Sequence, residues 1–116
     1  MIIEKLLKVV KYLNERDPKI IHYDLKPANI LFTKNNELKV TDFGLCKTLH
    51  KDQSKIKLTS WGCGTYYYLP PECLMYEENI MISSKVDVWA IGVIYFCLLY
   101  GTKPFGVNLK PKEYKQ

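Results

Sequence analysis

Apolar residues near the start of the chain recur at the spacing of a helix. Between residues 2 and 14 they stand three or four positions apart, and charged residues fill the positions between them. This period predicts one amphipathic helix that buries a single face. The pair Asp17-Pro18 follows. Because proline cannot continue the hydrogen-bond ladder of a helix, we expect the helix to end before it.

The next apolar runs are short and rich in residues that favour strands. Ile20 and Ile21 predict a very short strand. Residues 30–32 and 38–41 predict a small β-hairpin, because the polar residues 34–37 between them suit a tight turn. Residues 47–60 are polar and lysine-rich without a clear period, which predicts a mobile loop.

A second helix is predicted from about residue 86. Asp87 stands three positions after Ser84, which is the spacing of a capping box at a helix N-terminus. Residues 88–100 carry no charge, so every face of this helix is apolar, and such a helix is normally buried all round. Gly101 is expected to end it. The apolar run is shorter than the roughly 18 residues expected of a membrane span.

Composition and charge narrow the class of protein. The 116 residues suffice for one domain at most, or for part of a larger one. Apolar residues at 47% and charged residues at 25% are ordinary for a folded protein and argue against disorder. The net charge of +5 comes mainly from scattered lysines. It suits anionic ligands such as nucleotide phosphates without indicating nucleic acid.

The cysteines and the N-terminal segment indicate in which cellular compartment the protein is expected. The four cysteines form no CxxC pair, and only His22 and His50 accompany them, so a zinc site is not expected. Free thiols suit a reducing compartment. The N-terminal segment interleaves charges and lacks the apolar core of a signal peptide. We therefore expect a soluble intracellular protein that contacts neither a membrane nor nucleic acid directly.

The candidate chemistry lies in the segment HYDLKPAN at residues 22–29 and in the tripeptide DFG that begins at Asp42. Asp24 can accept the proton of a hydroxyl nucleophile, and Lys26 can reach a transferred phosphate from the same loop. Asn29 and Asp42 offer hard oxygen ligands of the kind that Mg²⁺ prefers. The predicted hairpin would fold Asp42 back beside Asn29. Together these residues indicate a phosphoryl-transfer site.

No single motif carries this interpretation. A lone Asp or Lys in a loop is usually solvated, and a lone His is more often a satisfied core residue than a catalytic one. The chain, however, also holds the pattern GTxxYxxPE from Gly64 to Glu72 and the pattern DxW from Asp87 to Trp89. The joint order of these motifs is far more specific than any of them alone. The aromatic, glycine-punctuated segment 61–72 indicates a recognition surface.

The joint pattern resembles the catalytic lobe of eukaryotic protein kinases from Ile2 to about Gly106. Within that family it is most similar to the tousled-like serine/threonine kinases, through the stretches IIHYDLKPANIL, KVTDFGL, LTSWGCGTYYYLPPEC and SSKVDVWAIGVIYFCLLYGTKPFG. The resemblance implies an α+β, partial protein-kinase-like fold over residues 1–106. This would be a mainly helical C-lobe with a small β-hairpin, without the N-lobe and the last C-lobe helices. Residues 107–116 would be a lysine-containing tail.

The resemblance also implies a role for each site residue. Asp24 would be the catalytic base, Lys26 would contact the phosphate, and Thr65 would bridge the two. Asn29 and Asp42 would bind magnesium beside ATP, and Leu31 would lie under the adenine.

Further residues would hold the site in place. His22 and Phe43 would stack in a hydrophobic column, and Gly44 would let the DFG segment change state. Asp87 would anchor the backbone of the HYD loop. Glu72 would be a buried carboxylate whose arginine partner is absent. Residues 61–69 would form the end of the activation segment and the substrate-docking loop.

One residue departs from the common kinase pattern. Tyr23 replaces the arginine that in many kinases pairs with a phosphorylated activation loop, and a tyrosine cannot make that bidentate charge pair. Activation by a loop phosphate through this position is therefore not expected.

Two readings of the function stay open. The first is an ATP-dependent and Mg²⁺-dependent protein serine/threonine kinase segment, inactive alone because the chain has no GxGxxG loop and no VAIK-type lysine. It would need a partner or the missing N-lobe. The second is a non-catalytic kinase-derived binding module. Small-molecule phosphotransferases fit less well, because they lack the Lys26-Pro27 pair and the GTxxYxxPE pattern. The expected location is the nucleus or cytoplasm, with the tousled-like resemblance favouring the nucleus.

Overall fold

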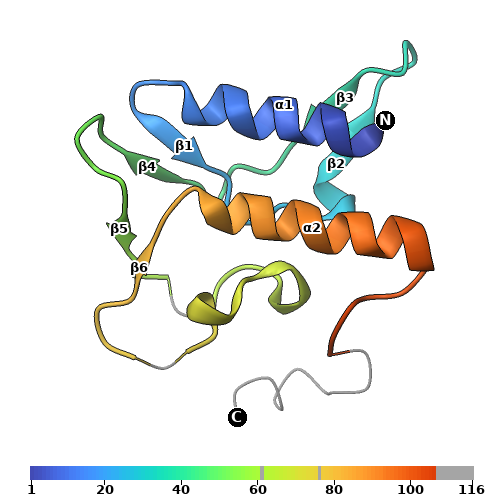
Figure 1. Cartoon of the computed structure of the whole chain (residues 1–116). Coiled ribbons are helices and arrows are strands. Elements are labelled where there is room, and N and C mark those ends of the chain that lie inside the picture. Colours follow the sequence, from blue (N-terminus) through green and yellow to red (C-terminus); the bar gives the residue numbers. More distant parts are fainter. Residues whose placement is uncertain (61, 76, 107–116) are drawn as a thin grey trace.

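The computed structural model describes residues 1–60, 62–75 and 77–106. In these ranges the chain forms two α-helices, three short 3-10 helices and three two-stranded antiparallel sheets, which confirms the predicted α+β class. Helices α1 (Ile2–Asn14) and α2 (Lys85–Tyr100) lie side by side (Figure 1). The first sheet lies near the C-terminal end of α1, and the hairpin of the second sheet lies near its N-terminal end (Figure 1).

Helix α1 forms where the apolar period predicted it. Its inward face buries Leu6, Val10 and Leu13, and the helix ends at Asn14, before Pro18. On the exposed face, Glu4 Oε1 lies 2.9 Å from Lys8 Nζ one turn later. That hydrogen bond and charge lower the pKa of Glu4. An exposed pair of this kind contributes little to stability, so the buried face is what fixes the helix.

The strands confirm the two short β predictions and correct the third. The predicted hairpin is present as β2 (Ile30–Phe32) paired with β3 (Leu38–Val40), and the predicted short strand as β1 (Lys19–Ile21). The loop expected over 47–60 is wrong in two places. There β4 (Lys47–Leu49) pairs with β1, and β5 (Ile56–Lys57) pairs with β6 (Met81–Ile82). These pairings join distant segments, so the local polarity of 47–60 does not reveal them.

Helix α2 (Lys85–Tyr100) confirms the second predicted helix, and its N-cap is Ser84, the residue at the predicted cap position. The helix ends at Gly101, whose positive φ of 68° is easily adopted by glycine. The hydrogen bonds expected of a capping box are absent, because the Ser84 side chain makes no cap hydrogen bond. The Asp87 carboxylate instead accepts hydrogen bonds from the backbone N–H groups of His22 and Tyr23. Buried N–H groups need an acceptor, and the Asp87 carboxylate supplies it for both.

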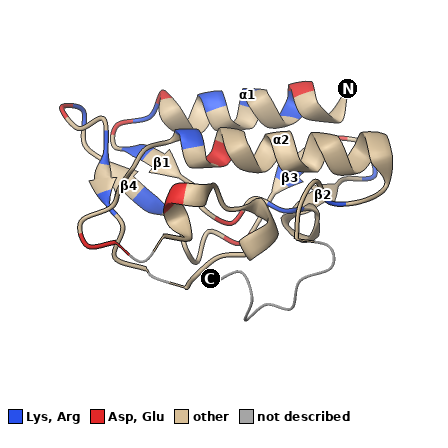
Figure 2. Ribbon diagram, turned by 60° about the horizontal axis from the view of Figure 1, so that its bottom comes forward, with Lys and Arg blue, Asp and Glu red and all other residues tan. Residues whose placement is uncertain are grey.

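Only part of α2 is covered within the described residues. Its buried positions include Val86, Ala90 and Ile94, whereas Leu98, Leu99 and Tyr100 are more than half exposed, at 54%, 57% and 66%. The helix carries no charged residue after Asp87 (Figure 2). The expectation of burial all round is therefore not met in the described part of the chain. Among the described helices, none combines the length and the apolar character that crossing a bilayer requires.

Two apolar clusters form the core, and residues 22–29 run between them. Tyr23 belongs to the cluster beneath the first and third sheets, and Leu25 belongs to the cluster between α1 and α2. The loop is thus held on both sides. Helix η1 (Pro27–Asn29) forms the end of this segment. Helices η2 (Tyr66–Tyr68) and η3 (Pro71–Cys73) lie below α2 in Figure 1, and η2 contacts α2.

Candidate active site

Asp87 of helix α2 holds the backbone at the start of the HYD loop through hydrogen bonds. His22 N and Tyr23 N donate hydrogen bonds to Asp87 Oδ2 and Oδ1 at 2.8 and 2.9 Å. Asp87 is fully buried, and burial raises the pKa of its carboxyl group, while the two backbone hydrogen bonds act in the opposite direction. Tyr23 has a φ of 71°, a left-handed conformation that is uncommon for a non-glycine residue. The Asp87 hydrogen bonds therefore hold a turn that the local sequence does not favour.

Asp24, Lys26 and Thr65 form a triangle of polar contacts. The Thr65 hydroxyl donates a hydrogen bond to Asp24 Oδ1 at 2.9 Å, although 41 positions separate the two residues. Lys26 Nζ donates to the same hydroxyl at 3.0 Å and lies 3.3 Å from Asp24 Oδ2. A single hydroxyl can donate and accept at once, so Thr65 links the carboxylate to the ammonium group. Asp24 is buried and Lys26 is half-buried, which strengthens their attraction relative to a surface pair.

Asn29 closes the other side of the loop. Pro27 begins η1, and the turn places Asn29 Nδ2 2.9 Å from the Asp24 backbone oxygen and 3.4 Å from Asp24 Oδ2. Because the amide nitrogen is used by the loop, the side-chain oxygen is the atom of Asn29 that could ligate a cation. Thr41 N donates to the Asn29 backbone oxygen at 2.9 Å. The β2–β3 hairpin thus returns the chain to Asn29 one residue before Asp42.

The DFG segment packs on His22. His22 Nε2 donates to the Thr41 backbone oxygen at 2.9 Å, and His22 Nδ1 accepts from Asp24 N at 3.2 Å. These two partners assign the neutral tautomer with the proton on Nε2. The Phe43 ring meets the imidazole edge-on, with centroids 4.8 Å apart and an interplanar angle of 64°. His22 therefore ties the HYD loop to the DFG segment.

Asp42 is exposed and its backbone is left-handed, with a φ of 61°. Its Oδ1 accepts a 3.3 Å hydrogen bond from Gly44 N, and a Cβ on residue 44 would come within 3.2 Å of that oxygen. Glycine at position 44 thus leaves room for the Asp42 carboxylate. No group of three or more His, Cys, Asp or Glu side chains capable of holding a metal occurs in the described ranges. One carboxylate and one amide oxygen on neighbouring segments still fit Mg²⁺, which takes most of its ligands from phosphate and water.

Two predicted site residues, Leu31 and Glu72, lie apart from this group of contacts. Leu31 is half exposed on β2. Glu72 is exposed at the surface of η3, so the expectation of a buried carboxylate without a partner is wrong. The predicted recognition segment begins at Trp61, which lies outside the described residues, and its remaining part forms η2 and η3.

A cluster around the Tyr23 side chain was not anticipated from the sequence. The ring is buried, the Tyr23 hydroxyl interacts with the Cys73 thiol, and Lys47 Nζ lies 4.9 Å from the ring centroid. Lys47 Nζ also donates to Ser60 Oγ at 2.8 Å. Burial raises the pKa of Tyr23, and it raises the pKa of Cys73 to about 11. The sequence marked Tyr23 as unusual, but it held no signal that these distant residues surround it.

Comparison with known proteins assigns the family. The family model of the protein kinase domain matches residues 1–116. The chain is 50% identical over 123 residues to serine/threonine-protein kinase tousled-like 2 of Xenopus tropicalis and of Homo sapiens, covering 99% of this chain and 18% and 16% of those proteins. It is 50% identical over 108 residues to serine/threonine-protein kinase TOUSLED of Arabidopsis thaliana, covering 91% of this chain and 16% of that protein. The chain thus spans less than a fifth of the length of these relatives. It belongs to the protein kinase domain family, with tousled-like serine/threonine kinases as its relatives.

Proposed function

We propose that this chain carries the catalytic loop of a protein serine/threonine kinase, with Asp24 as the base that receives the proton of the substrate hydroxyl. The observation that carries the proposal is the triangle of Asp24, Lys26 and Thr65, in which both contacts to the Thr65 hydroxyl are 3.0 Å or shorter. Two segments distant in sequence bring these three polar groups together, beside the apolar packing of Tyr23 with Leu69. A structural role does not require a carboxylate, an ammonium group and a hydroxyl at one point.

The geometry suits phosphoryl transfer, which needs an oriented hydroxyl and neutralised charge rather than covalent help. Thr65 holds Asp24 through Oδ1, and we assign the proton to Oδ2, whose neighbours are Lys26 Nζ and, at the longer distance of 3.4 Å, Asn29 Nδ2. Lys26 Nζ lies 3.3 Å from Oδ2, so a hydroxyl bound there also lies beside a cation. That cation counters the negative charge of the phosphoryl group as it moves to the substrate.

Asn29 and Asp42 are proposed to hold Mg²⁺, through the amide oxygen of one and the exposed carboxylate of the other. A bound magnesium ion supplies positive charge to the phosphate oxygens of ATP. The backbone hydrogen bond between Thr41 and Asn29 keeps the two ligand-bearing segments together. Leu31, exposed on β2, offers an apolar surface to the adenine ring.

Residues 1–106 are proposed to form the C-lobe part of a kinase domain, and residues 107–116 a lysine-containing tail outside the described structure. The 116 residues contain no glycine-rich loop and no VAIK-type lysine. We therefore propose that this stretch taken alone does not transfer phosphate, and that a nucleotide-covering lobe, in the same polypeptide or in a partner, completes it. The substrate would be a protein hydroxyl, and the location the nucleus or the cytoplasm.

The alternative is a kinase-derived module that binds a partner without catalysis. The observation that favours it is the exposed apolar face at the end of α2, where Leu98, Leu99 and Tyr100 lie in solvent. Exposed apolar surface of this kind commonly marks an interaction site. This alternative gives Asp24 no chemical task, so the two proposals differ in what Asp24→Asn would do.

The test compares the 116-residue chain alone with the same chain joined to the glycine-rich lobe of a tousled-like kinase. ATP-dependent phosphorylation of a basic protein is the readout, and Mg²⁺ is removed with a chelator in a parallel sample. We expect no transfer by the chain alone and transfer by the joined protein, reduced at least 100-fold by Asp24→Asn. Lys55→Gln, at an exposed loop position, is the matched control and leaves the rate unchanged.

Two results would count against the kinase proposal. One is a joined protein that is folded and binds Mg-ATP but transfers no phosphate. The other is undiminished transfer by the Asp24→Asn protein. Binding of a partner with no transfer under any condition would favour the non-catalytic module.

A further inference from the structure

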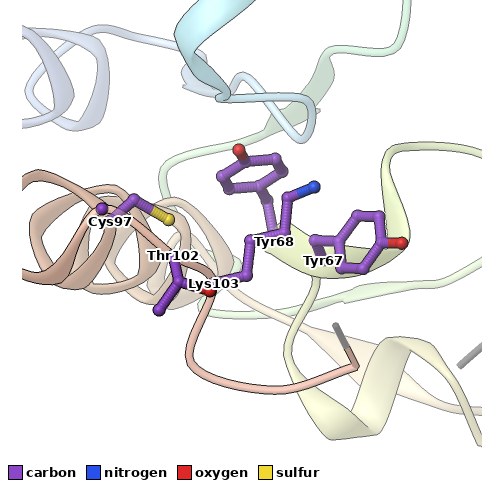
Figure 3. Close-up of a pocket in the computed structure, with 6 residues that line it drawn as sticks. Tyr67, Tyr68, Cys97, Thr102 and Lys103 are labelled. Carbon is purple, nitrogen blue, oxygen red and sulfur yellow. The ribbon is translucent and has the colours of Figure 1, made fainter. Parts of the chain in front are cut away.

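A pocket of about 420 Å³ lies between η2 and the end of α2. Its lining comes from both segments, with Tyr67 and Tyr68 on one side and Cys97, Gly101, Thr102 and Lys103 on the other. Figure 3 shows the Lys103 side chain extending from the segment after α2 toward the tyrosines. The pocket is separate from the triangle of Asp24, Lys26 and Thr65, and no step proposed above uses it.

The lining has the chemistry of an anion site. It contains hydroxyl groups and one ammonium group, and neither Asp nor Glu. Lys103 Nζ lies 3.8 Å from the centroid of the Tyr67 ring, and the salt bridges among the described residues do not include Lys103. Tyr68 is partly buried, and this burial raises the pKa of its hydroxyl. A half-buried cation attracts an anion more strongly than a solvated one does.

The position of the pocket links it to the proposed site of transfer. Thr65 is the N-cap of η2, and its hydroxyl contacts both Asp24 and Lys26. Tyr67 and Tyr68 follow two and three residues later. Consecutive Cα atoms are about 3.8 Å apart, so the pocket opens within roughly 10 Å of Thr65. An extended peptide rises about 3.3 Å per residue. A side chain two or three residues from a hydroxyl held at Asp24 therefore reaches the pocket.

We propose that this pocket is a substrate subsite that selects an Asp or Glu side chain two or three positions from the phosphorylated Ser or Thr. The proposal rests on the proposed kinase function and names the class of substrate. Lys103 pairs with the substrate carboxylate, and the hydroxyls of Tyr68 and Thr102 donate hydrogen bonds to it. A Lys or Arg side chain of the substrate is rejected there, because it meets Lys103 and no acidic residue of the pocket.

The test measures peptide binding, because binding does not require phosphate transfer. Fluorescein-labelled peptides with one Ser carry Glu at a single position two or three residues before or after it, and matched peptides carry Gln or Lys at that position. Binding to the 116-residue chain is followed by fluorescence polarisation. We expect the best Glu peptide to bind about tenfold more tightly than its Gln counterpart and the Lys peptide to bind most weakly.

Variants then assign the preference to the pocket. Lys103→Glu is expected to reverse it in favour of the Lys peptide, and Lys103→Met, which keeps contact with the Tyr67 ring, is expected to abolish it. Lys55→Glu makes the same charge change at an exposed loop position and is expected to keep the preference. Circular dichroism verifies the fold of each variant. Equal binding of Glu and Gln peptides, no binding of any peptide, or an unchanged preference in both Lys103 variants would overturn the proposal.

Failure of the kinase proposal has a different signature. The Asp24→Asn chain is expected to keep the Glu preference while the joined protein loses phosphate transfer. A chain that prefers the Glu peptide, and whose joined form never phosphorylates it, would contradict the proposed function and leave an acidic-peptide site.

Discussion

The Asp87 carboxylate lies 2.8 Å from the backbone nitrogen of His22, which is 65 positions earlier in the chain. It accepts a second backbone hydrogen bond from Tyr23 at 2.9 Å. Through these two bonds helix α2 holds the turn from which Asp24 projects. The conformation of the HYD loop thus depends on a helix far from it in the sequence.

Substitution of Asp87 is expected to destabilise the fold. Asp87→Ala leaves two buried N–H groups without an acceptor, and we expect a loss of about 2–4 kcal/mol in the free energy of unfolding. Asp87→Asn keeps one acceptor oxygen and should lose less. Urea unfolding followed by circular dichroism measures both. Glu4→Ala, at an exposed ion pair, is the control and should change stability by less than about 0.5 kcal/mol. An Asp87→Ala protein as stable as the parent would contradict the anchoring role.

Loss of the Thr65 hydroxyl is expected to reduce catalysis more than stability. Thr65→Val removes the link between Asp24 and Lys26, which frees both side chains to leave the observed geometry. In the joined kinase we expect kcat to fall about 10-fold to 100-fold with a small change in KM. Thr65→Ser keeps the hydroxyl and should restore most of the rate. Steady-state kinetics on the parent, the Thr65→Val protein and the Thr65→Ser protein measure these effects. Equal kcat values for the parent and the Thr65→Val protein would contradict a role of Thr65 in catalysis.

The buried thiol of Cys73 predicts a loss of stability at alkaline pH. Its pKa is raised by burial from 9.0 to about 11, so above pH 9 the unfolded state releases a proton that the folded state retains. Stability from this group is therefore full below pH 9 and falls between pH 9 and 11, by up to about 2–3 kcal/mol. Tyr23, whose pKa is raised by burial, acts in the same direction.

Urea unfolding at a series of pH values measures this slope. Cys73→Ala is expected to make it shallower, whereas Cys46→Ala, at an exposed cysteine, should leave it unchanged. Identical slopes for the parent and the Cys73→Ala protein would show that the thiol is not held in its protonated form by burial.

Two glycines are expected to respond in opposite ways to alanine. Gly64 has a φ of 89°, and a Cβ there would lie 3.3 Å from Leu69 and 3.5 Å from Tyr23, so Gly64→Ala should cost about 1–2 kcal/mol. Gly92 lies inside α2 with nothing within 4 Å of its Cβ position, so Gly92→Ala should stabilise by about 0.5–1 kcal/mol. Thermal unfolding compares the pair. A stabilising Gly64→Ala would contradict the close packing of this turn on Tyr23.

The sequence predicted those helices and strands that depend on interactions between neighbouring residues of the chain. Residues that are neighbours in the chain determine the apolar period of α1 and the end of α2 at Gly101. They also determine the hairpin between the HYDLKPAN and DFG motifs. The strands β4 and β5 were missed, because each has only two or three residues with a single apolar side chain and forms only through pairing with a distant segment. The capping box at Ser84 failed for a related reason. The spacing was correct, but buried N–H groups of the HYD loop bind the Asp87 carboxylate instead.

The sequence by itself determined which chemical groups this protein has and the family to which it belongs, because the order of HYDLKPAN, DFG and GTxxYxxPE is a property of the chain. Only the tertiary structure decided which of those groups meet. Thr65 reaches Asp24, and Lys103 reaches Tyr67, across intervals that no local pattern spans. The physical reason is that hydrogen bonds and charge pairs depend on distances of a few ångströms. Those distances are set by the packing of α1, α2 and the buried clusters rather than by position in the sequence.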